Sequence, residues 1–396
     1  MYKNGEGVDV MVCLVVNAIS VKEGGSLVVL RELVKGIRQL RPEWTIHVVA
    51  SDEAVLELQG IPTIEIHTYS KVSRSSWRTR VWYELGLIRL LKNVRADVLF
   101  SHTNYLPIRK TPCKRLLLEQ HAGHFSLIFH ELMYQTLKLR GRIAWRMKGN
   151  WVRRSVVAAE EVTVQTAALA DAISSSTSRP RERITVIPHG IGLSNVLEKS
   201  LRFPSRTEPF VVGYTTKFGV QKNFDVVFLA ISELKRRGLN CRLEVTLNPN
   251  LAENHQLLRK AEQLGLEKHL TNLGELSPQD VSNVYARFHA FVFPSLCESF
   301  GFPLVEAMAN NLPVVVAETA SNREVAAEAG IYFSPHDFLE LADHLQKLAS
   351  DPHWYSDRVS ASQARQSAFS WERAAIQTTE LIERMVTDGS QPGVRQ

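Results

Sequence analysis

Short apolar runs of strand length alternate with amphipathic stretches of helix length along most of the chain, and this alternation constrains the fold most strongly. The first series begins with an apolar run over 8–19 and a helical pattern over 27–40, and it ends with the apolar run 184–188. A second series extends from 210 to 333. Strands that alternate with helices form right-handed βαβ units, which build parallel sheets covered by helices. The pattern therefore predicts an α/β protein with two doubly wound parallel sheets.

A segment without strand pattern, 193–209, separates the two series and contains two prolines, as expected for a linker. We therefore predict an N-terminal domain over 1–192 and a C-terminal domain over 210–369. A last helix is predicted over 370–387, followed by a flexible polar tail, 388–396. In two-lobed α/β proteins a ligand binds at the carboxyl ends of the strands, which predicts a binding cleft between the lobes.

The net charge of +6 is distributed unevenly along the 396 residues. Residues 71–154 contain 18 Lys and Arg but four acids, so this stretch carries +14 and the remainder −8. If it is helical, side chains at four-residue intervals form one largely cationic stripe, comprising Lys138, Arg142, Arg146, Asn150 and Arg154. Like charges at this spacing repel each other, so the stripe indicates an anionic neighbour.

Four of the seven tryptophans lie in the same stretch, at 77, 82, 145 and 151. Tryptophans beside cations are typical of membrane interfaces, so residues 71–154 are predicted to attach to an anionic membrane surface. A solvated basic face with the tryptophans in the core is the alternative. Nucleic acid is not expected as a partner, because no recognition motif accompanies the charge.

The four cysteines show neither disulfide-like nor zinc-like spacing, which predicts reduced thiols in the cytoplasm. The longest apolar run near the N-terminus, Val10–Ile19, is too short to cross a bilayer. We therefore expect a protein that is cytoplasmic, or peripheral at the inner face of the cell membrane.

The segment 294–313 concentrates the residues that could carry chemistry. Glu298 and Glu306 lie eight positions apart, on either side of a predicted helix start with Pro303 at its first position. The N-terminus of such a helix favours a phosphate, and two carboxylates beside it could hold hydroxyls of a sugar and a ribose. The alternative is a solvated loop residue followed by an acid that stabilises the first turns.

This segment resembles the E-x7-E signature of the retaining glycosyltransferases of family 4. The match extends from Pro294 to Val315, with Ser299 and Asn311 at two positions where the family has Gly. The resemblance implies the GT-B fold, in which two Rossmann-like domains face each other across a cleft. It also implies a hexosyltransferase that uses a nucleotide-sugar donor.

Other motifs of the family follow in the expected order. The segment 213–223 resembles G-R-x-x-x-x-K-G, in which two cations bind the donor diphosphate, with Lys217 in place of Arg. The segment 187–192 resembles P-N-G-V-D, with Gly192 in place of Asp. The resemblance implies a donor site formed by Gly25, Gly190, Lys217, Lys222, Leu276, Glu298, Ser299, Phe300, Gly301, Phe302 and Glu306.

Two histidines, His121 and His124, follow a predicted buried strand of the N-terminal lobe, where relatives place a residue that contacts the donor sugar. His121 is our choice for this contact and His124 the alternative. Asn17 and Asn104, at other strand ends, are weaker candidates on the acceptor side. The predicted catalytic residues are therefore Glu298, His121 and Lys222.

The mechanism that the resemblance implies is a retaining transfer without a metal or another cofactor. None of the eleven Asp residues stands two positions from another, so the chain contains no D-x-D metal motif. Lys217, Lys222 and the helix N-terminus would stabilise the leaving diphosphate, and Glu298 the oxocarbenium-like sugar. We expect neither a covalent glycosyl-enzyme nor a protein base.

The sequence thus predicts transfer from a UDP-, GDP- or dTDP-sugar to a glycan or lipid-linked acceptor. The expected setting is bacterial surface polysaccharide assembly, of the O-antigen or capsule type. Two alternatives are a nucleotide-sugar epimerase of GT-B fold and a non-catalytic relative that binds a sugar nucleotide or a lipid.

Overall fold

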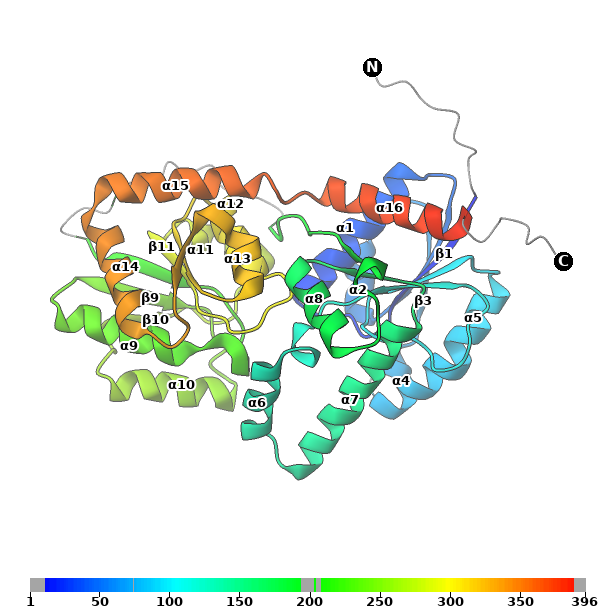
Figure 1. Ribbon diagram of the computed structural model, residues 1–396, viewed down its shortest axis with the longest axis horizontal. Helices are drawn as coiled ribbons and strands as arrows, with labels where there is room; N and C mark the ends of the chain where they lie inside the picture. Colours follow the sequence, from blue (N-terminus) through cyan, green and yellow to red (C-terminus); the bar gives the residue numbers. More distant parts are fainter. Residues whose placement is uncertain (1–10, 74, 194–202, 204–207, 388–396) are drawn as a thin grey trace, which may run out of the picture.

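The computed structural model describes residues 11–73, 75–193, 203 and 208–387, arranged as two lobes that lie side by side (Figure 1). The predicted tail, 388–396, and most of the predicted linker, 193–209, fall outside the described residues. Each lobe contains one parallel sheet with helices on its faces, which confirms the predicted fold class.

The first lobe contains a seven-stranded parallel sheet with the order β3-β2-β1-β4-β5-β6-β7. Its strands are β1 (Cys13–Ala18), β2 (Thr45–Ala50), β3 (Ile64–Thr68), β4 (Val98–Ser101), β5 (Lys114–Leu118), β6 (Glu161–Val164) and β7 (Ile184–Val186). Its α-helices are α1 (Gly25–Leu40), α2 (Asp52–Leu58), α3 (Ser70–Ser73), α4 (Ser76–Trp82), α5 (Ile88–Asn93), α6 (Leu127–Thr136), α7 (Leu139–Ala158) and α8 (Ala167–Ser176). Shorter helical turns are η1 (Tyr83–Leu87), η2 (Ala122–His124) and η3 (Arg181–Arg183).

The second lobe contains a six-stranded parallel sheet with the order β10-β9-β8-β11-β12-β13. Its strands are β8 (Phe210–Tyr214), β9 (Cys241–Val245), β10 (Leu270–Asn272), β11 (Ala290–Phe293), β12 (Val314–Ala317) and β13 (Gly330–Phe333). Its helices and turns are η4 (Val220–Lys222), α9 (Phe224–Arg236), α10 (Ala252–Gln263), α11 (Pro278–Tyr285), α12 (Phe302–Ala309), α13 (Ala320–Ala326), η5 (Ala327–Ala329), α14 (Phe338–Ser350) and α15 (Pro352–Gln366).

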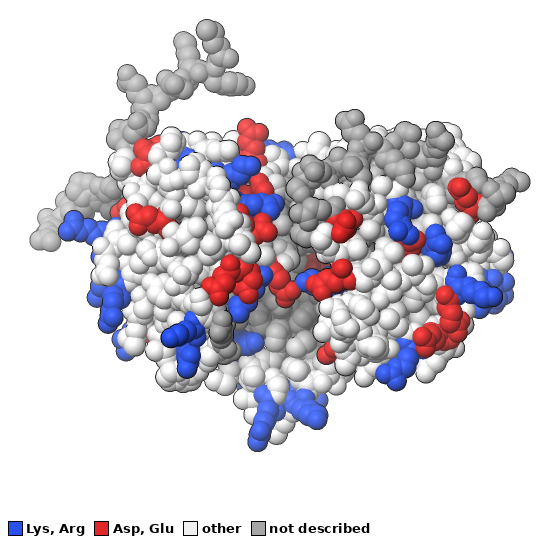
Figure 2. Space-filling model, turned by 180° about the vertical axis from the view of Figure 1, so that it is seen from behind, with Lys and Arg blue, Asp and Glu red and all other residues white. Residues whose placement is uncertain are grey.

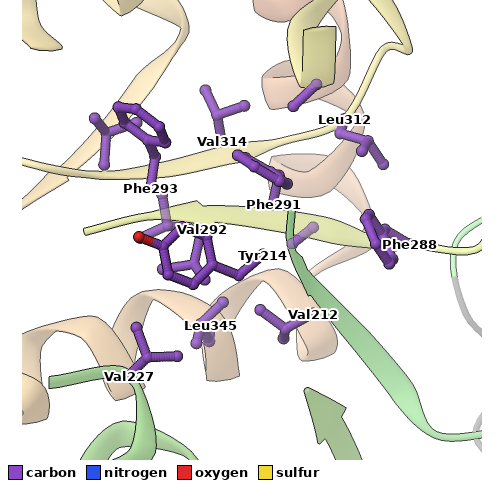
Figure 3. Close-up of a cluster of buried hydrophobic side chains, with 14 of the residues drawn as sticks. Val212, Tyr214, Val227, Phe288, Phe291, Val292, Phe293, Leu312, Val314 and Leu345 are labelled. Atoms are coloured by element: carbon purple, nitrogen blue, oxygen red, sulfur yellow. The ribbon is translucent and has the colours of Figure 1, made fainter. Parts of the chain in front are cut away.

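The core of the second lobe forms where branched and aromatic strand residues meet the helices (Figure 3). Phe291 and Val314, from neighbouring strands, are fully buried, as are Val227 of α9 and Leu345 of α14. Strands that are buried on both faces read as continuous apolar runs, which is why the sequence predicts them so closely. The predicted bounds of β12, 314–317, agree with the observed bounds.

Two elements, β3 and α15, have no counterpart in the predictions from sequence. β3 is an edge strand whose side chains are half-buried or exposed, so its apolar pattern is weak. α15 buries only Tyr355 and Ser362 among its described residues, which gives no clear apolar face. Marginal burial removes the periodicity on which such predictions rest.

The last helix, α16 (Trp371–Thr387), leaves the second lobe and packs along α1 of the first lobe (Figure 1). Ala374 and Ile382 are completely buried in this contact. The approach is close because α1 carries Gly36, at which an added Cβ would lie 2.4 Å from Cβ of Ala375. A terminal helix thereby ties the two lobes together.

Helices α6 and α7 form a hairpin that protrudes below the first lobe (Figure 1). Figure 2 shows Lys and Arg side chains at the tip of the corresponding protrusion. The predicted cationic stripe lies on α7, preceded by Lys138, and its side chains are exposed. Exposed apolar side chains lie beside the cations, namely Leu127, Leu139, Ile143 and Met147.

The four tryptophans of the basic stretch differ in exposure, and their role at a membrane interface stays a prediction. Trp82 is buried, whereas Trp145, which stacks on His124, and Trp151, which packs on Tyr105, are half-buried. Trp77 alone among the four is largely exposed. The aromatic rings fill space between helices, so the exposed apolar surface of the hairpin is aliphatic. None of the described helices has the length and apolar content needed to cross a bilayer.

Replacing Gly36 with Ala is expected to lower the free energy of unfolding by about 1–3 kcal/mol. The new methyl group would lie 2.4 Å from Cβ of Ala375, and neither atom can move unless a helix shifts. Chemical denaturation followed by circular dichroism measures the loss. Lys35→Ala, at an exposed position of the same helix, is the matched control. The double variant Gly36→Ala/Ala375→Gly should recover more than half of the loss, and unchanged stability of Gly36→Ala would contradict the close packing.

Candidate active site

Lys222 and Glu298 form an ion pair in the second lobe. Lys222 ends the turn η4 that follows β8, and Glu298 lies in the loop between β11 and α12. The Lys222 Nζ donates to Glu298 Oε1 at 2.5 Å, and each side chain is only about one-seventh exposed, 13% and 15% respectively. Two of the predicted catalytic groups, separated by 76 positions in the sequence, are therefore in direct contact.

The backbone after Glu298 turns sharply into α12. Gly301 has φ +86°, and an added Cβ there would lie 2.9 Å from the Phe293 ring. Only glycine fits both restrictions without strain. Pro303 occupies the second position of the helix rather than the predicted first. At the other end, Asn311 has φ +61°, the left-handed conformation that asparagine tolerates.

Glu306 is half-buried in α12, and the Tyr285 hydroxyl donates to its Oε2 at 2.8 Å. Burial raises the pKa of this carboxyl from 4.5 to about 7, although the tyrosine hydrogen bond lowers it. A Cβ added at Gly192 would lie 2.4 Å from Glu306 Oε1. A side chain at 192 would therefore require the Glu306 carboxyl to move.

Glycine positions also bring the two lobes into close contact. A Cβ added at Gly25, the first residue of α1, would lie 2.6 Å from the Phe302 ring of α12. A Cβ at Gly190 would lie 2.4 Å from the Trp371 ring of α16. The predicted donor residues Gly25 and Phe302, which come from different lobes, therefore lie against each other.

Lys217 extends from the second lobe toward the first. Its Nζ lies 2.6 Å from Glu23 Oε2 and 3.3 Å from Glu275 Oε1, and 59% of its side chain is exposed. It is not part of the Lys222–Glu298 pair. Leu276, next to Glu275, is half-buried against the core of the second lobe.

His121 precedes the turn η2, after β5. Burial lowers its pKa, and the charge of Glu298, which belongs to the other lobe, acts in the opposite direction. His121 Nδ1 is buried and has no hydrogen-bond partner among the described residues.

His124 has a different environment, because its ring stacks on Trp145 with 4.3 Å between centroids. Burial and the neighbouring positive and imidazole groups lower its pKa to about 3, without a contribution from Glu298. Of the two histidines, His121 is thus the one coupled to the Glu298 charge.

The two predicted acceptor-side asparagines differ in their contacts. Asn17 ends β1 and is completely buried, and its Nδ2 has no partner among the described residues. Asn104, with φ +63°, accepts a hydrogen bond at Oδ1 from the Gln120 amide at 2.8 Å. Asn104 therefore joins the loops after β4 and β5, whereas Asn17 keeps an unused donor.

Glu119 is a further buried carboxyl that the sequence reasoning missed. Its Oε1 accepts from the His121 amide at 3.0 Å, and its Oε2 has no partner among the described residues. Burial raises its pKa well above the usual range. Its position two residues before His121, at the end of a buried strand, was the available signal.

The residues Ser321-Asn-Arg-Glu324 have the Ser-x-x-Glu pattern of a capping box, but they do not form one. Thr319 caps α13, by accepting from the Asn322 amide. Glu324 instead accepts from the Ala167 and Ala168 amides, at 2.6 and 2.9 Å, at the start of α8 in the other lobe. A carboxylate is stabilised there by the positive end of the helix dipole.

The loop between β11 and α12, which contains Glu298, also contacts α8 of the first lobe. Thr166, the N-cap residue of α8, donates from its hydroxyl to the Ser299 carbonyl at 3.1 Å. Phe300 is buried between His189 and Phe369. The predicted donor loop is therefore held from both sides.

Solved structures with the same architecture align with nearly the whole chain. Anabaena Alr3699/HepE in complex with UDP and glucose aligns with a TM-score of 0.68 and 19% identity, covering 94% of this chain and 99% of that chain. WaaG, a glycosyltransferase involved in lipopolysaccharide biosynthesis, aligns with a TM-score of 0.68 and 14% identity, covering 93% and 99%. At these identities the similarity establishes the fold, which is GT-B.

Two family models match consecutive parts of the chain. Glycosyltransferase Family 4 matches residues 23–195, and Glycosyl transferases group 1 matches residues 198–367. Together the two models cover most of the chain, which therefore belongs to the group 1, family 4 glycosyltransferases.

Curated relatives match part of the chain. O-antigen chain mannosyltransferase B of Escherichia coli is 32% identical over 126 residues, which are 32% of this chain and 33% of that protein. D-inositol 3-phosphate glycosyltransferase of Paenarthrobacter aurescens is 26% identical over 245 residues, 59% of this chain and 60% of that protein. The matches thus span less than two thirds of these relatives' own lengths.

The raised pKa of Glu306 predicts a pH-dependent stability. The carboxyl binds its proton more tightly in the folded chain, with a pKa of about 7, than in the unfolded chain, near 4.5. Stability therefore falls as pH rises from about 4.5 to 7, because the unfolded state loses the proton first. Glu306→Gln should gain stability relative to wild type over this range, by up to on the order of 3 kcal/mol.

Urea denaturation at pH 5 and at pH 8 measures this difference. Glu253→Gln, which alters an exposed carboxylate, is the control and should show no such change between the two pH values. Equal pH dependence in Glu306→Gln and wild type would mean that the carboxyl is charged throughout this range.

Proposed function

We propose that this glycosyltransferase is a retaining, metal-independent enzyme that transfers a sugar from a nucleotide-sugar to a glycan or lipid-linked acceptor. The pathway that we propose is bacterial surface polysaccharide assembly. The observation that carries this proposal is the largely buried Lys222–Glu298 pair, and the charge of Glu298 also acts on His121 of the other lobe. The O-antigen mannosyltransferase among the relatives supports the pathway.

The Lys222 ammonium is suited to bind the donor diphosphate. It has three protons, and one of them binds Glu298 Oε1. The other protons can be donated to phosphate oxygens, beside the N-terminus of α12 with its partial positive charge. Solved structures with the same fold contain UDP or UDP-glucose, which supports a nucleotide-sugar donor for this chain. Lys217 is the second cation of this site, near the edge of the cleft.

In the reaction, positive charge develops on the sugar and negative charge on the leaving diphosphate. A charged group of the site lies in position to stabilise each of them. Lys222 and the α12 N-terminus stabilise the negative diphosphate as it leaves. Glu298 stabilises the positive sugar, and its contact with Lys222 holds the carboxylate in position. The leaving phosphate accepts the acceptor's proton on the same face of the sugar, so the configuration is retained.

His121 and Glu306 position the donor in this proposal. The unpartnered Nδ1 of His121 binds a hydroxyl of the transferred sugar. The absence of a side chain at Gly192 leaves an approach to Glu306 Oε1, where a ribose hydroxyl would bind. The Tyr285 hydroxyl holds the other carboxyl oxygen in place.

A donor panel tests the function directly. Purified protein is incubated with UDP-, GDP- and dTDP-sugars and a mixture of lipid-linked acceptors, and nucleotide release is measured with and without a chelator. Lys222→Ala and Glu298→Gln should each lower kcat by about 10²- to 10³-fold. Lys235→Ala removes an exposed lysine of the same lobe that binds the Gly265 carbonyl, and it should leave the rate unchanged.

The alternatives give different products. An epimerised donor would indicate an epimerase, and donor binding without turnover would indicate a non-catalytic relative. Proton NMR of the transferred sugar distinguishes retention from inversion, and an inverted product would refute the proposed mechanism. Transfer that is unaffected in Lys222→Ala and Glu298→Gln would refute the proposed site.

The α6–α7 hairpin is the proposed membrane contact. It combines exposed cations of α7 with exposed aliphatic side chains, including Leu139, which is 72% exposed, and Met147, which is 56% exposed. Cations attract anionic headgroups, and aliphatic side chains can enter the boundary between headgroups and acyl chains. This attachment would bring the cleft to a lipid-linked acceptor at the inner face of the membrane.

Sedimentation with phosphatidylserine-containing vesicles measures this contact. Arg140→Gln/Arg146→Gln removes about 2 kcal/mol of attraction, which corresponds to roughly thirtyfold weaker binding. The control, Arg259→Gln/Lys268→Gln, removes the same charge from exposed positions of the second lobe and should bind as wild type. Equal binding by the two double variants would contradict the proposed surface.

A further inference from the structure

Two histidines and a glutamate meet at the outer edge of the first sheet, away from the proposed transfer site. In the register of β2 and β3, His47 pairs with Glu65 and Val49 pairs with His67. Side chains two positions apart lie on the same face of a sheet, so His47, Glu65 and His67 share one face. Strands β2, β1 and β4 lie between this edge and β5, which precedes His121.

The three side chains converge on one point. His47 Nδ1 lies 3.1 Å from Glu65 Oε2 and also 3.1 Å from His67 Nε2. All three ligand atoms lie within 4.8 Å of one another. Zinc bonds of about 2.0–2.1 Å at tetrahedral angles place neighbouring ligand atoms roughly 3.3 Å apart. The two separations from His47 Nδ1, each 3.1 Å, are close to this value.

Hydrogen bonds alone satisfy this cluster poorly. A single nitrogen, His47 Nδ1, faces both other groups, and it can carry only one proton. That proton cannot point along both 3.1 Å directions, so at least one contact lacks good geometry. A cation at the centre would instead accept a lone pair from each of the three groups.

The cluster is also accessible to an ion from solvent. The His47 side chain is 7% exposed, whereas that of Glu65 is 66% exposed. The buried histidine provides a fixed anchor, and the open side allows the ion to enter and a water to complete the coordination. Two imidazoles and one carboxylate are a ligand set that suits zinc.

We propose that His47, Glu65 and His67 bind a divalent transition-metal ion, best matched by Zn²⁺, which fastens the edge strand β3 to β2. β3 has one neighbouring strand and half-buried or exposed side chains, so a metal bridge would stabilise the part of the sheet with the least packing. This site is separate from the sugar-transfer residues, and the proposed transfer remains metal-independent.

Isothermal titration of untagged, metal-stripped full-length protein with Zn²⁺ tests the proposal. Wild type should bind one ion per chain and show a higher melting temperature with zinc. His67→Gln and Glu65→Gln each remove one ligand. Losing an outer-shell partner of a metal ligand lowers metal affinity about 10- to 100-fold. Losing a ligand itself should lower the affinity for zinc by at least this factor. Glu65 is largely exposed, so Glu65→Gln tests the site even if His67→Gln folds poorly.

His353→Gln is the matched control. His353 is 90% exposed and lies 3.2 Å from Asp357, so it forms a histidine–carboxylate pair without a third ligand. This variant should bind zinc as wild type does. The proposal is overturned if wild type binds no zinc, or if folded Glu65→Gln and His67→Gln bind it as tightly as wild type. Sugar transfer is not the readout, so failure of the proposed function would not affect this result.

Discussion

Parallel strands that are joined by helices leave all their carboxyl ends at one edge of the sheet, and the functional site depends on this constraint. In the first lobe, Asn17 ends β1 and His121 follows β5. In the second lobe, Lys222 and Glu298 follow β8 and β11. Two such edges that face each other bring together polar groups from distant parts of the chain. Helix α16 maintains this arrangement, because it begins beside the second lobe and packs on α1 of the first.

The contact between the lobes depends on small residues as much as on charges. Gly25 allows the Phe302 ring to approach the start of α1, and Gly190 allows Trp371 to approach the end of the first lobe. Gly192 leaves space beside the Glu306 carboxyl. Each of these contacts would require a shift of the backbone or of a ring if a methyl group were added. The charged contacts, Lys217–Glu23 and Glu324 with the start of α8, then join surfaces that already fit.

Local patterns predicted much of the fold and part of the site. Buried strands such as β12 have continuous apolar runs, and the signature from Pro294 to Val315 combines a strand, a turn and a helix start in one short segment. The edge strand β3 was missed because burial there is slight. Without that strand, no local pattern indicates that His47 and His67 converge. The pairing of Glu306 with Tyr285 was missed because a distance of 21 positions along the chain carries no periodic signal.

The amino-acid sequence by itself determined the alternation of strands and helices, the glycosyltransferase signature and the concentration of positive charge between 71 and 154. These properties are local, since they depend on the residue types within short windows of the chain. Only the tertiary structure decided which charges meet. It paired Lys222 with Glu298, exposed His121 to the charge of Glu298, directed Glu324 to the other lobe and packed three of the four tryptophans of the basic stretch against other aromatic rings. Such contacts follow from how two sheets and their covering helices pack in space, and separation along the chain does not encode that packing.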